Sequence, residues 1–406
     1  MTSQNPADGN PDAHAPGMPV VAIIGDGQLA RMMQTAAIEL GQSVRLLAGS
    51  ADSSAAQVAA DVLLGDYTDI DDLRRAARGA DVVTFDHEHV PTEHLRQLIA
   101  DGVNVQPAPD ALLNAQDKLV MRKRLRELGA PVPPFAAITN VEDALAFSDA
   151  VEGAVCLKAR RGGYDGHGVW FPADREELST LVADLLARGT ELMAEKRVTL
   201  NRELSAVVAR TPSGETAAWP VVESVQREGV CAEAVAPAPD LGAELQHSTR
   251  ALAERIATEL GVTGVLAVEL FETRDANGQP EIYVNELAMR PHNTGHWTQD
   301  GCVTSQFEQH LRAVLDYPLG STATLASHTV MANVLAAQED PAEPMAQRMT
   351  QVWERFPNAR IHLYGKGFRP GRKIGHVNIT GADLTDVRRN ATAAAHYLVH
   401  ATWPME

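Results

Sequence analysis

The sequence predicts a mixed α/β and α+β protein that begins with a doubly wound parallel sheet. Three observations lead to this fold class. Strand-like apolar runs alternate with helix-like segments between residues 20 and 105, a glycine turn follows the first run, and two strand-like runs lie close together near residue 280. A chain of 406 residues is long enough for two to three domains.

Composition narrows the functional class. The net charge of −18 disfavours non-specific nucleic-acid binding, and no apolar run approaches the ~20 residues of a membrane span. The polar N-terminus lacks the basic start and apolar stretch of a signal peptide. Cys156, Cys231 and Cys302 form no CxxC pair, which is typical of reduced cytoplasmic thiols. We therefore expect a cytoplasmic protein that contacts neither nucleic acid nor membrane.

The first part of the chain predicts a disordered leader over residues 1–18 and a Rossmann-like domain over 19–115. Glycines and turn residues separate its elements. Strands are expected at 20–24, 43–47, 81–85 and 103–105, and helices at 28–40, 69–78 and 92–100.

A basic helix over 115–129 ends at Gly129 and a proline-rich segment, which marks a domain junction. A small domain over 116–200 is expected to hold strands at 155–159 and 191–196 and a helix at 177–186. The remaining domain, 201–406, is expected to hold strands at 203–209, 217–222, 264–271 and 281–286, strands near Val330, Ile361 and Val377, and helices at 243–260, at 306–315 and from about Ala382.

The segment GDGQLA, residues 25–30, matches the GxGxxA turn of dinucleotide-binding proteins. That fingerprint also needs an acid about 20 residues later to hold the ribose, and none occurs before Asp52. Three interpretations stay open: an NAD site, a tight turn that needs glycines, and a phosphate-bearing substrate at the helix N-terminus.

The segment KARRGGYDGHG, residues 158–168, places four glycines after a strand that ends in Lys158. Such a loop presents backbone N–H groups to phosphate oxygens, and the lysine adds a point charge. No Walker A ending closes it. The alternative is a glycine-rich hairpin with a solvated lysine.

Carboxylates mark the two late strands: Glu269 in the first, and Asn285-Glu286 at the end of the second. A glutamate in an apolar strand is costly unless it is paired or bound to a cation. Brought together, these oxygens suit Mg²⁺ that carries nucleotide phosphates. Solvent exposure alone is an alternative for Glu269.

The loop RPHNTGHW, residues 290–297, concentrates a cation, two imidazoles, an amide and a hydroxyl directly after Glu286. A loop that serves stability alone rarely needs such chemistry. Pro291 and Gly295 disfavour a helix, so the His292–His296 spacing gives little support to a metal site.

The segment GRKIGH, residues 371–376, follows Lys366 and Arg369 and forms a cluster of cations in an acidic chain. The cluster predicts an anion pocket. A solvated basic turn is the alternative.

In this order, Lys118, Lys158 with its glycine loop, residues 195–198, Glu269 and Asn285-Glu286 resemble the ATP-grasp ligases. Within them, residues 25–29, 162–168, 290–298 and 371–376 resemble the N5-carboxyaminoimidazole ribonucleotide synthases of purine synthesis, also called the ATPase subunit of phosphoribosylaminoimidazole carboxylase. The resemblance spans about residues 20–400. It implies a pre-ATP-grasp domain followed by an ATP-grasp module over about 118–318, with 116–200 as the small lid domain.

The resemblance also implies a reaction, in which ATP and bicarbonate carboxylate 5-aminoimidazole ribonucleotide through carboxyphosphate in IMP biosynthesis. Mg²⁺ would be the cofactor, the protein a homodimer, and an N5-carboxyaminoimidazole ribonucleotide mutase the recipient of the product. Three alternatives stay open: another ATP-grasp ligase, such as a formate-dependent glycinamide ribonucleotide transformylase or a biotin carboxylase; an NAD-dependent oxidoreductase; and a non-catalytic nucleotide-binding protein.

Residue roles follow from the resemblance alone. Arg290, His292, Asp165 and Tyr164 would be catalytic, and Glu269 and Glu286 would bind the metal. ATP would contact Lys118, Lys158, Gly162, Gly163, Tyr164, Asp165, Gly166, His167, Gly168, Glu195, Lys196, Arg197, Val198, Glu203, Asn285 and Glu286. The acceptor nucleotide would contact Gly27, Gln28, Leu29, Glu88, Asn293, Thr294, Lys366, Arg372 and Lys373. Three residues depart from the family pattern: His167 and Lys118 stand where arginine is common, and Thr294 replaces a usual serine.

Overall fold

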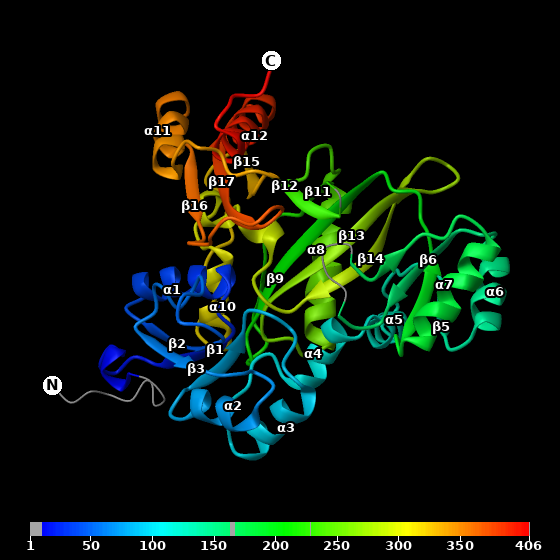
Figure 1. The fold of residues 1–406 in the computed structure, drawn as a ribbon, viewed down its shortest axis with the longest axis horizontal. Helices are drawn as coiled ribbons and strands as arrows, with labels where there is room; N and C mark the ends of the chain where they lie inside the picture. Colours follow the sequence, from blue (N-terminus) through cyan, green and yellow to red (C-terminus); the bar gives the residue numbers. More distant parts are fainter. Residues whose placement is uncertain (1–9, 163–166, 228, 406) are drawn as a thin grey trace.

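The computed structural model describes residues 10–162, 167–227 and 229–405, and its strands form three sheets. Figure 1 shows the N-terminal sheet at the lower left and the small sheet at the right. A long sheet runs between them and continues upward to the C-terminus. No described helix is both long and apolar enough to cross a lipid bilayer.

The N-terminal sheet is parallel, with the strand order β3-β2-β1-β4. Its elements are β1 (Val20–Ile24), β2 (Ser43–Ala48), β3 (Asp61–Leu64), β4 (Val82–Phe85), α1 (Gln28–Glu39), α2 (Ile70–Ala77) and α3 (Thr92–Ala100). Val21 and Ile23 pack with α1 on one face, whereas Ala22 and Ile24 pack with α2 and α3 on the other. The sheet is therefore doubly wound, as predicted.

The fourth strand of this sheet is β3, not the predicted segment 103–105, which makes only a single bridge between Val83 and Val105. β3 begins with Asp61, a charged residue that is fully buried. The structure neutralises it, because Arg45 Nε lies 2.7 Å from Asp61 Oδ2. An ion pair between neighbouring strands thus makes an acidic residue compatible with the core.

Residues 10–18 of the predicted leader are among the described residues, whereas residues 1–9 lie outside them, and disorder of the leader stays a prediction. A short 3-10 helix, η1 (Pro11–Ala13), precedes His14, whose Nε2 lies 2.8 Å from Asp61 Oδ2. Ser43 Oγ donates to the Ala13 carbonyl at 2.7 Å. These polar contacts fix the segment against β2 and β3 without an apolar pattern that the sequence would reveal.

The predicted basic helix over 115–129 is present as α5 (Lys118–Glu127), and a separate helix, α4 (Pro109–Gln116), precedes it. Asp117 separates them with extended backbone, and its Oδ1 accepts the N–H groups of Leu119 and Val120 at 3.0 and 3.2 Å. This side chain caps α5, so the chain restarts as a helix at Lys118.

The small sheet is antiparallel, with the order β5-β8-β6-β7. Its strands are β5 (Phe135–Ile138), β6 (Val155–Ala159), β7 (Val169–Trp170) and β8 (Leu192–Lys196). Helices α6 (Val141–Ala150) and α7 (Arg175–Ala187) share a common apolar core with these strands.

The long sheet has the order β14-β13-β9-β11-β12-β15-β17-β16, with β10 beside β9. Its strands are β9 (Arg202–Arg210), β10 (Thr216–Ala218), β11 (Val222–Arg227), β12 (Val230–Ala236), β13 (Gly264–Arg274), β14 (Pro280–Ala288), β15 (His328–Leu335), β16 (Arg360–Leu363) and β17 (Lys373–Gly381). The predicted strand at 217–222 is split, because Pro220 has no N–H to donate to a ladder.

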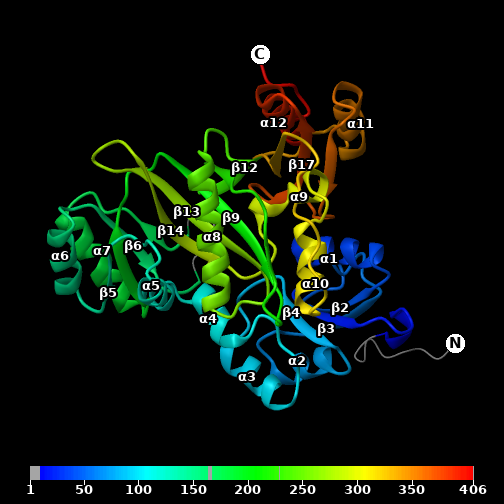
Figure 2. The same ribbon diagram turned by 180° about the vertical axis from the view of Figure 1, so that it is seen from behind.

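Helices cover this sheet on different faces and at different ends. They are α8 (Ala243–Glu259), η2 (Asn293–Gly295), α9 (Thr298–Gly301), α10 (Gln306–Val314), α11 (Met345–Arg355) and α12 (Leu384–His400). Figure 2 shows α8 lying across β9, β13 and β14, while α11 and α12 lie beside the C-terminal strands.

His310 joins the N-terminal and long sheets. Its Nδ1 accepts the Val265 N–H at 3.1 Å, so Nε2 carries the proton toward Thr84 Oγ1 at 2.9 Å. The contact fixes the end of β4 near the loop that follows β14. The sheets span residues 20–85, 135–196 and 202–381. The predicted domain limits at 18, 115 and 200 stay predictions.

Candidate active site

Glu269 on β13 and Glu286 on β14 lie opposite each other as register partners. The next pair along the ladder is Leu270 with Val284, so Asn285 forms a β-bulge with no partner. A bulge changes the direction in which side chains point. Here Asn285 contacts Lys158 and Glu286 contacts Lys118, and both lysines belong to the predicted small domain. The structure thus brings together the three oxygen ligands that the sequence predicted.

Two lysines contact these oxygens. Lys118, at the start of α5, places Nζ 2.9 Å from Glu286 Oε1. Lys158, buried at the end of β6, donates to Asn285 Oδ1 at 3.2 Å and ion-pairs with Glu195. Two cations from the predicted lid domain therefore point at the carboxylates of the long sheet.

Glu195 is committed to partners within the protein. Its carboxylate binds Lys158 and also Arg122 of α5, at 2.8 Å from Nη2. Burial alone would raise the pKa of Glu195, but the charges of Arg122 and Lys158 lower it to about 2. Only its backbone is left for the predicted adenine contact. The neighbouring Lys196 and Arg197 are exposed, and Val198 is half-buried.

Glu203 lies on the same face of β9 as Ser205, which pairs with Glu269. Burial, reinforced by the charge of Glu269, raises the pKa of Glu203 to about 7. Glu203 therefore adds a carboxyl group beside Glu269 that takes up a proton near neutral pH, chiefly because it is buried.

The residues present fit Mg²⁺ bound together with phosphates. Among the described residues, no three His, Cys, Asp or Glu side chains are grouped to hold a metal by themselves. Mg²⁺ in phosphate-binding enzymes usually takes one or two carboxylates, with waters and phosphate oxygens completing the shell. The Glu269–Glu286 pair provides that number.

Arg290 follows β14 and ties the loop to the N-terminal domain. Its Nε donates to Glu88 Oε2 at 2.8 Å, and Glu88 Oε1 accepts the Met289 N–H at 3.3 Å. Glu88 follows β4, so the carboxyl end of the parallel sheet meets the loop here. Both residues were expected at the acceptor site, and the structure places them in contact.

His292 lies against the carboxylate pair, with Nε2 at 3.0 Å from Glu269 Oε1. Its Nδ1 accepts the Thr294 N–H, so the ring proton sits on Nε2 and faces Glu269. Thr294 Oγ1 lies 2.9 Å from the same Nδ1 and 2.7 Å from Ser205 Oγ. Nδ2 of Asn293 is buried and has no hydrogen-bond partner in the described structure, so it is available to donate to a bound molecule.

The end of the predicted loop is structural. His296 and Trp297 are each 1% exposed, and Trp297 packs in an apolar core with residues of β9, β12, β13 and α10. Within the loop only η2 forms, a 3-10 turn of 3 residues, and α9 begins after the loop at Thr298. The chemistry of residues 290–297 is therefore confined to its first half.

The GxGxxA turn is occupied by the chain's own carboxylate. Asp86, which follows β4, accepts the Gly27 N–H at 2.6 Å. A Cβ at Gly25 would lie 1.8 Å from Asp86 Oδ1, so the turn needs glycine to admit this side chain. Burial raises the pKa of Asp86 to about 6. Asp86 uses the Gly27 N–H, which a dinucleotide phosphate would need, and this counts against the dinucleotide interpretation.

Of the predicted contacts in this turn, Gln28 Oε1 accepts from Lys366 Nζ, which joins the turn to the C-terminal loop. The side chain of Leu29 is buried in the core with α1, so the predicted contact of Leu29 with the acceptor nucleotide stays a prediction for its backbone. The sequence did not single out Asp86, although its position after β4 is the signal that was available.

The C-terminal cations lie beside this turn. Lys366 sits over the Tyr364 ring, 5.6 Å from its centroid, and burial lowers the pKa of Lys366 to about 8. Arg372 Nη1 donates to the Gly367 carbonyl at 3.1 Å, and Lys373 begins β17. Lys366 thus joins the C-terminal segment to the α1 turn, and the anion pocket stays a prediction.

The glycine loop is described only at its ends. Gly162 and Gly168 both have φ of +75°, a conformation that favours glycine, and His167 lies beside Gly168. The predictions for Gly163, Tyr164, Asp165 and Gly166 fall outside the described residues.

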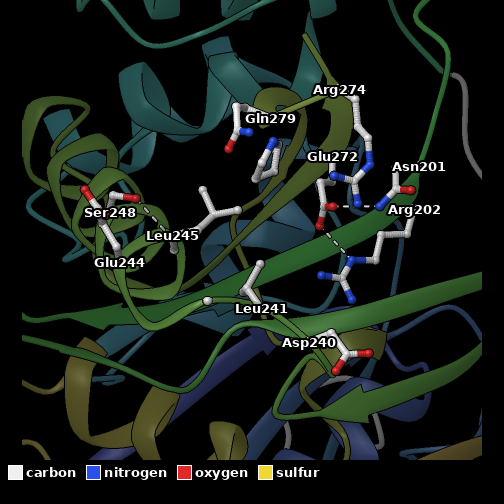
Figure 3. A pocket seen from close by; sticks show the side chains of 12 residues that line it. Asn201, Arg202, Asp240, Leu241, Glu244, Leu245, Ser248, Glu272, Arg274 and Gln279 are labelled. Atoms are coloured by element: carbon white, nitrogen blue, oxygen red, sulfur yellow. Dashed lines mark hydrogen bonds and ion pairs between the residues drawn. The ribbon is translucent and has the colours of Figure 1, made fainter. Parts of the chain in front are cut away.

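A separate cavity of about 640 Å³ lies beside the start of α8 (Figure 3). Glu272 projects into it and pairs with Arg202 at 2.6 Å. Glu272 lies on the sheet face that carries Leu270 and α8, opposite the face of Glu269. This cavity is therefore distinct from the carboxylate site.

Three domain families match the chain: the ribonucleotide synthetase pre-ATP-grasp domain over residues 18–116, the ATP-grasp domain over 123–307, and the phosphoribosylaminoimidazole carboxylase C-terminal domain over 329–390. A solved N5-carboxyaminoimidazole ribonucleotide synthetase from Thermus thermophilus has a TM-score of 0.82 and 36% identity, covering 95% of this chain and 100% of the other. The ATP-grasp fold predicted from the sequence is confirmed.

Curated relatives agree over nearly the whole chain. The N5-carboxyaminoimidazole ribonucleotide synthase of Corynebacterium ammoniagenes is 66% identical over 98% of this chain and 96% of its own length. That of Mycobacterium bovis is 54% identical over 95% of this chain and 89% of its own length. The chain belongs to the N5-carboxyaminoimidazole ribonucleotide synthase family.

Proposed function

We propose that this protein uses ATP and bicarbonate to carboxylate 5-aminoimidazole ribonucleotide, giving the N5-carboxy product, ADP and phosphate in purine (IMP) biosynthesis. One observation carries the proposal: His292 of the acceptor loop contacts Glu269 of the carboxylate pair at 3.0 Å. In the proposed function, this contact between His292 Nε2 and Glu269 Oε1 joins the site for phosphoryl transfer to the site for the acceptor. A relative from Aspergillus clavatus was solved with ADP and 5-aminoimidazole ribonucleotide, which supports both ligands.

The phosphate half of the site is formed by Lys118, Lys158 and Asn285. Lys158 is buried and shares Glu195 with Arg122, so the buried group carries an excess positive charge. That excess attracts the β- and γ-phosphates of ATP. Mg²⁺, held by Glu269 and Glu286, would supply further charge neutralisation as the γ-phosphate transfers to bicarbonate.

The acceptor half lies between the α1 turn and the C-terminal loop. Lys366, Arg372 and Lys373 provide the cations for the 5′-phosphate of the nucleotide. Arg290, oriented by Glu88 at 2.8 Å, is the cation for bicarbonate. Asn293 adds its unpaired buried Nδ2 as a donor.

The chemical step needs orientation and a proton acceptor. Phosphorylation makes bicarbonate a carboxyphosphate, whose carboxyl group is then delivered to the exocyclic amine. For His292 to accept a proton at Nε2, the proton that Nε2 now carries must first pass to Glu269, because Nδ1 already accepts from Thr294. Asp165 is the other predicted acceptor.

Family resemblance alone supports several further proposals. We extend to this chain a homodimeric state, a cytoplasmic location and transfer of the product to a mutase. The domain limits and the remaining ATP contacts rest on the same support.

Phosphate release from ATP with bicarbonate tests the acceptor. We expect release to rise with 5-aminoimidazole ribonucleotide and to stay at the basal rate with glycinamide ribonucleotide or biotin. Equal stimulation by glycinamide ribonucleotide or biotin would instead identify another ATP-grasp ligase, and release that ignores all three would overturn the proposal.

A further inference from the structure

Gln306 is a fully buried residue at the start of α10, and its side-chain amide grips the loop that carries His292. Oε1 accepts the His292 N–H at 2.8 Å, and Nε2 donates to the His292 carbonyl at 2.8 Å. Nε2 also lies 2.9 Å from His296 Nδ1. One amide thus uses both of its hydrogens and its oxygen on a single turn of loop.

These two hydrogen bonds to the His292 backbone determine where the His292 ring lies. Both peptide groups that flank His292 are fixed by the same rigid, planar amide, so the loop has little freedom to rotate there. From that backbone the ring reaches Glu269 at 3.0 Å and Thr294 Oγ1 at 2.9 Å. Gln306 itself has no contact with Glu269 or Arg290 among those described.

The Gln306 amide packs directly against Gly295. A Cβ at this position would lie 2.3 Å from Gln306 Oε1 and 2.6 Å from its Cδ. Real side chains do not approach so closely, so any larger residue at 295 must displace the Gln306 amide. The close approach of Gln306 is therefore one physical reason for a glycine at this position.

We propose that Gln306 is a positioning residue for carboxylation: it holds His292 against Glu269, so that the activated carboxyl group and the acceptor meet in register. The inference rests on the proposed function and assigns to this residue a role that stability alone does not require. Misplacement of a reacting group by about 1 Å costs up to about a hundredfold in rate.

Gln309 offers a matched control on the same helix. It is also fully buried, and its amide binds the backbone of Gly320, with Nε2 to the carbonyl at 2.8 Å and Oε1 to the N–H at 2.7 Å. Gln306→Leu and Gln309→Leu both remove buried amide hydrogen bonds. We expect similar losses in melting temperature, so a difference in catalysis reports on position.

The experiment measures carboxylated product and phosphate release at saturating ATP for the wild type and both variants. We expect Gln306→Leu to lower kcat about tenfold or more, with the KM for ATP changed less than about twofold, and to release more phosphate per product. Gln309→Leu should keep the wild-type ratio. Equal ratios in the two variants would overturn the inference.

Gly295→Ala keeps the Gln306 side chain and displaces it, which covers the case where Gln306→Leu does not fold. We expect the same excess of phosphate over product, and a wild-type ratio in this variant would also overturn the inference. Wild-type protein that shows no turnover with 5-aminoimidazole ribonucleotide would refute the proposed function instead, so the two failures are distinguishable.

Discussion

Arg122 and Glu195 form a buried, two-point ion pair, in which Nε and Nη2 of Arg122 lie 2.9 and 2.8 Å from the same oxygen of Glu195. The other oxygen of Glu195 contacts Lys158. Two cations share one carboxylate, so the lysine that faces Asn285 is not fully neutralised. This sharing explains how a buried lysine stays available to a phosphate.

Removal of the arginine tests this cluster. Arg122→Met leaves Glu195 with a single partner, and we expect a loss of about 3 kcal/mol in unfolding free energy, measured with urea. Arg124→Met is the control on the same helix, because Arg124 has an exposed pair with Glu127 worth less than about 1 kcal/mol. Similar losses in both variants would contradict the assignment.

Glu203 predicts a pH-dependent stability. Burial and the charge of Glu269 raise the pKa of Glu203 to about 7 in the folded protein, from its ordinary value of 4.5. The folded protein therefore binds this proton more tightly, and the stability it contributes is complete below about pH 4.5 and lost as pH rises through 7. We expect Glu203→Gln to gain melting temperature over wild type at pH 8 but not at pH 4.5. An unchanged difference at both pH values would refute the shift.

Lys366 predicts an alkaline limit on acceptor binding. Burial lowers its pKa to about 8, so the charge proposed to hold the 5′-phosphate is lost above that pH. We expect the KM for 5-aminoimidazole ribonucleotide to rise above about pH 8 in the wild type. Lys366→Arg keeps its charge and should remove this rise. An identical rise in Lys366→Arg would assign the limit to another group.

A substitution at Gly25 tests whether the Asp86 side chain is fixed in its position against this turn. Gly25→Ala places a Cβ 1.8 Å from Asp86 Oδ1 at a φ of +121°, and we expect a loss of about 3 kcal/mol or more in unfolding free energy. Gly41→Ala, at a φ of +67° with no atom within 4 Å, should lose about 1 kcal/mol from backbone strain alone. Equal losses would show that Asp86 relaxes freely.

Much of the fold could be predicted from local pattern. The apolar run at β1, the glycine that ends α1 and the paired late strands each carry their signal within a few residues. The break at Asp117 has a local signal, the cap on Leu119 and Val120, that our sequence prediction did not use. The strand at Asp61 could not be predicted locally, because it depends on Arg45 of the neighbouring strand.

The site was predicted in its residue types more than in its geometry. Glu269, Glu286 and His292 were expected near one another, and the register and the bulge at Asn285 show how they meet. The occupation of the glycine turn by Asp86 and the grip of Gln306 on His292 were not predicted, because both join segments that are far apart in sequence.

Oxygen transfer from bicarbonate to phosphate tests the central claim most directly. In the proposed route, a bicarbonate oxygen attacks the γ-phosphorus and stays with it when the carboxyl group moves to the acceptor amine. Turnover with ¹⁸O-labelled bicarbonate and 5-aminoimidazole ribonucleotide should therefore release phosphate that carries one labelled oxygen, as read by mass spectrometry. Phosphate without label, formed alongside the carboxylated product, would contradict activation of bicarbonate by ATP.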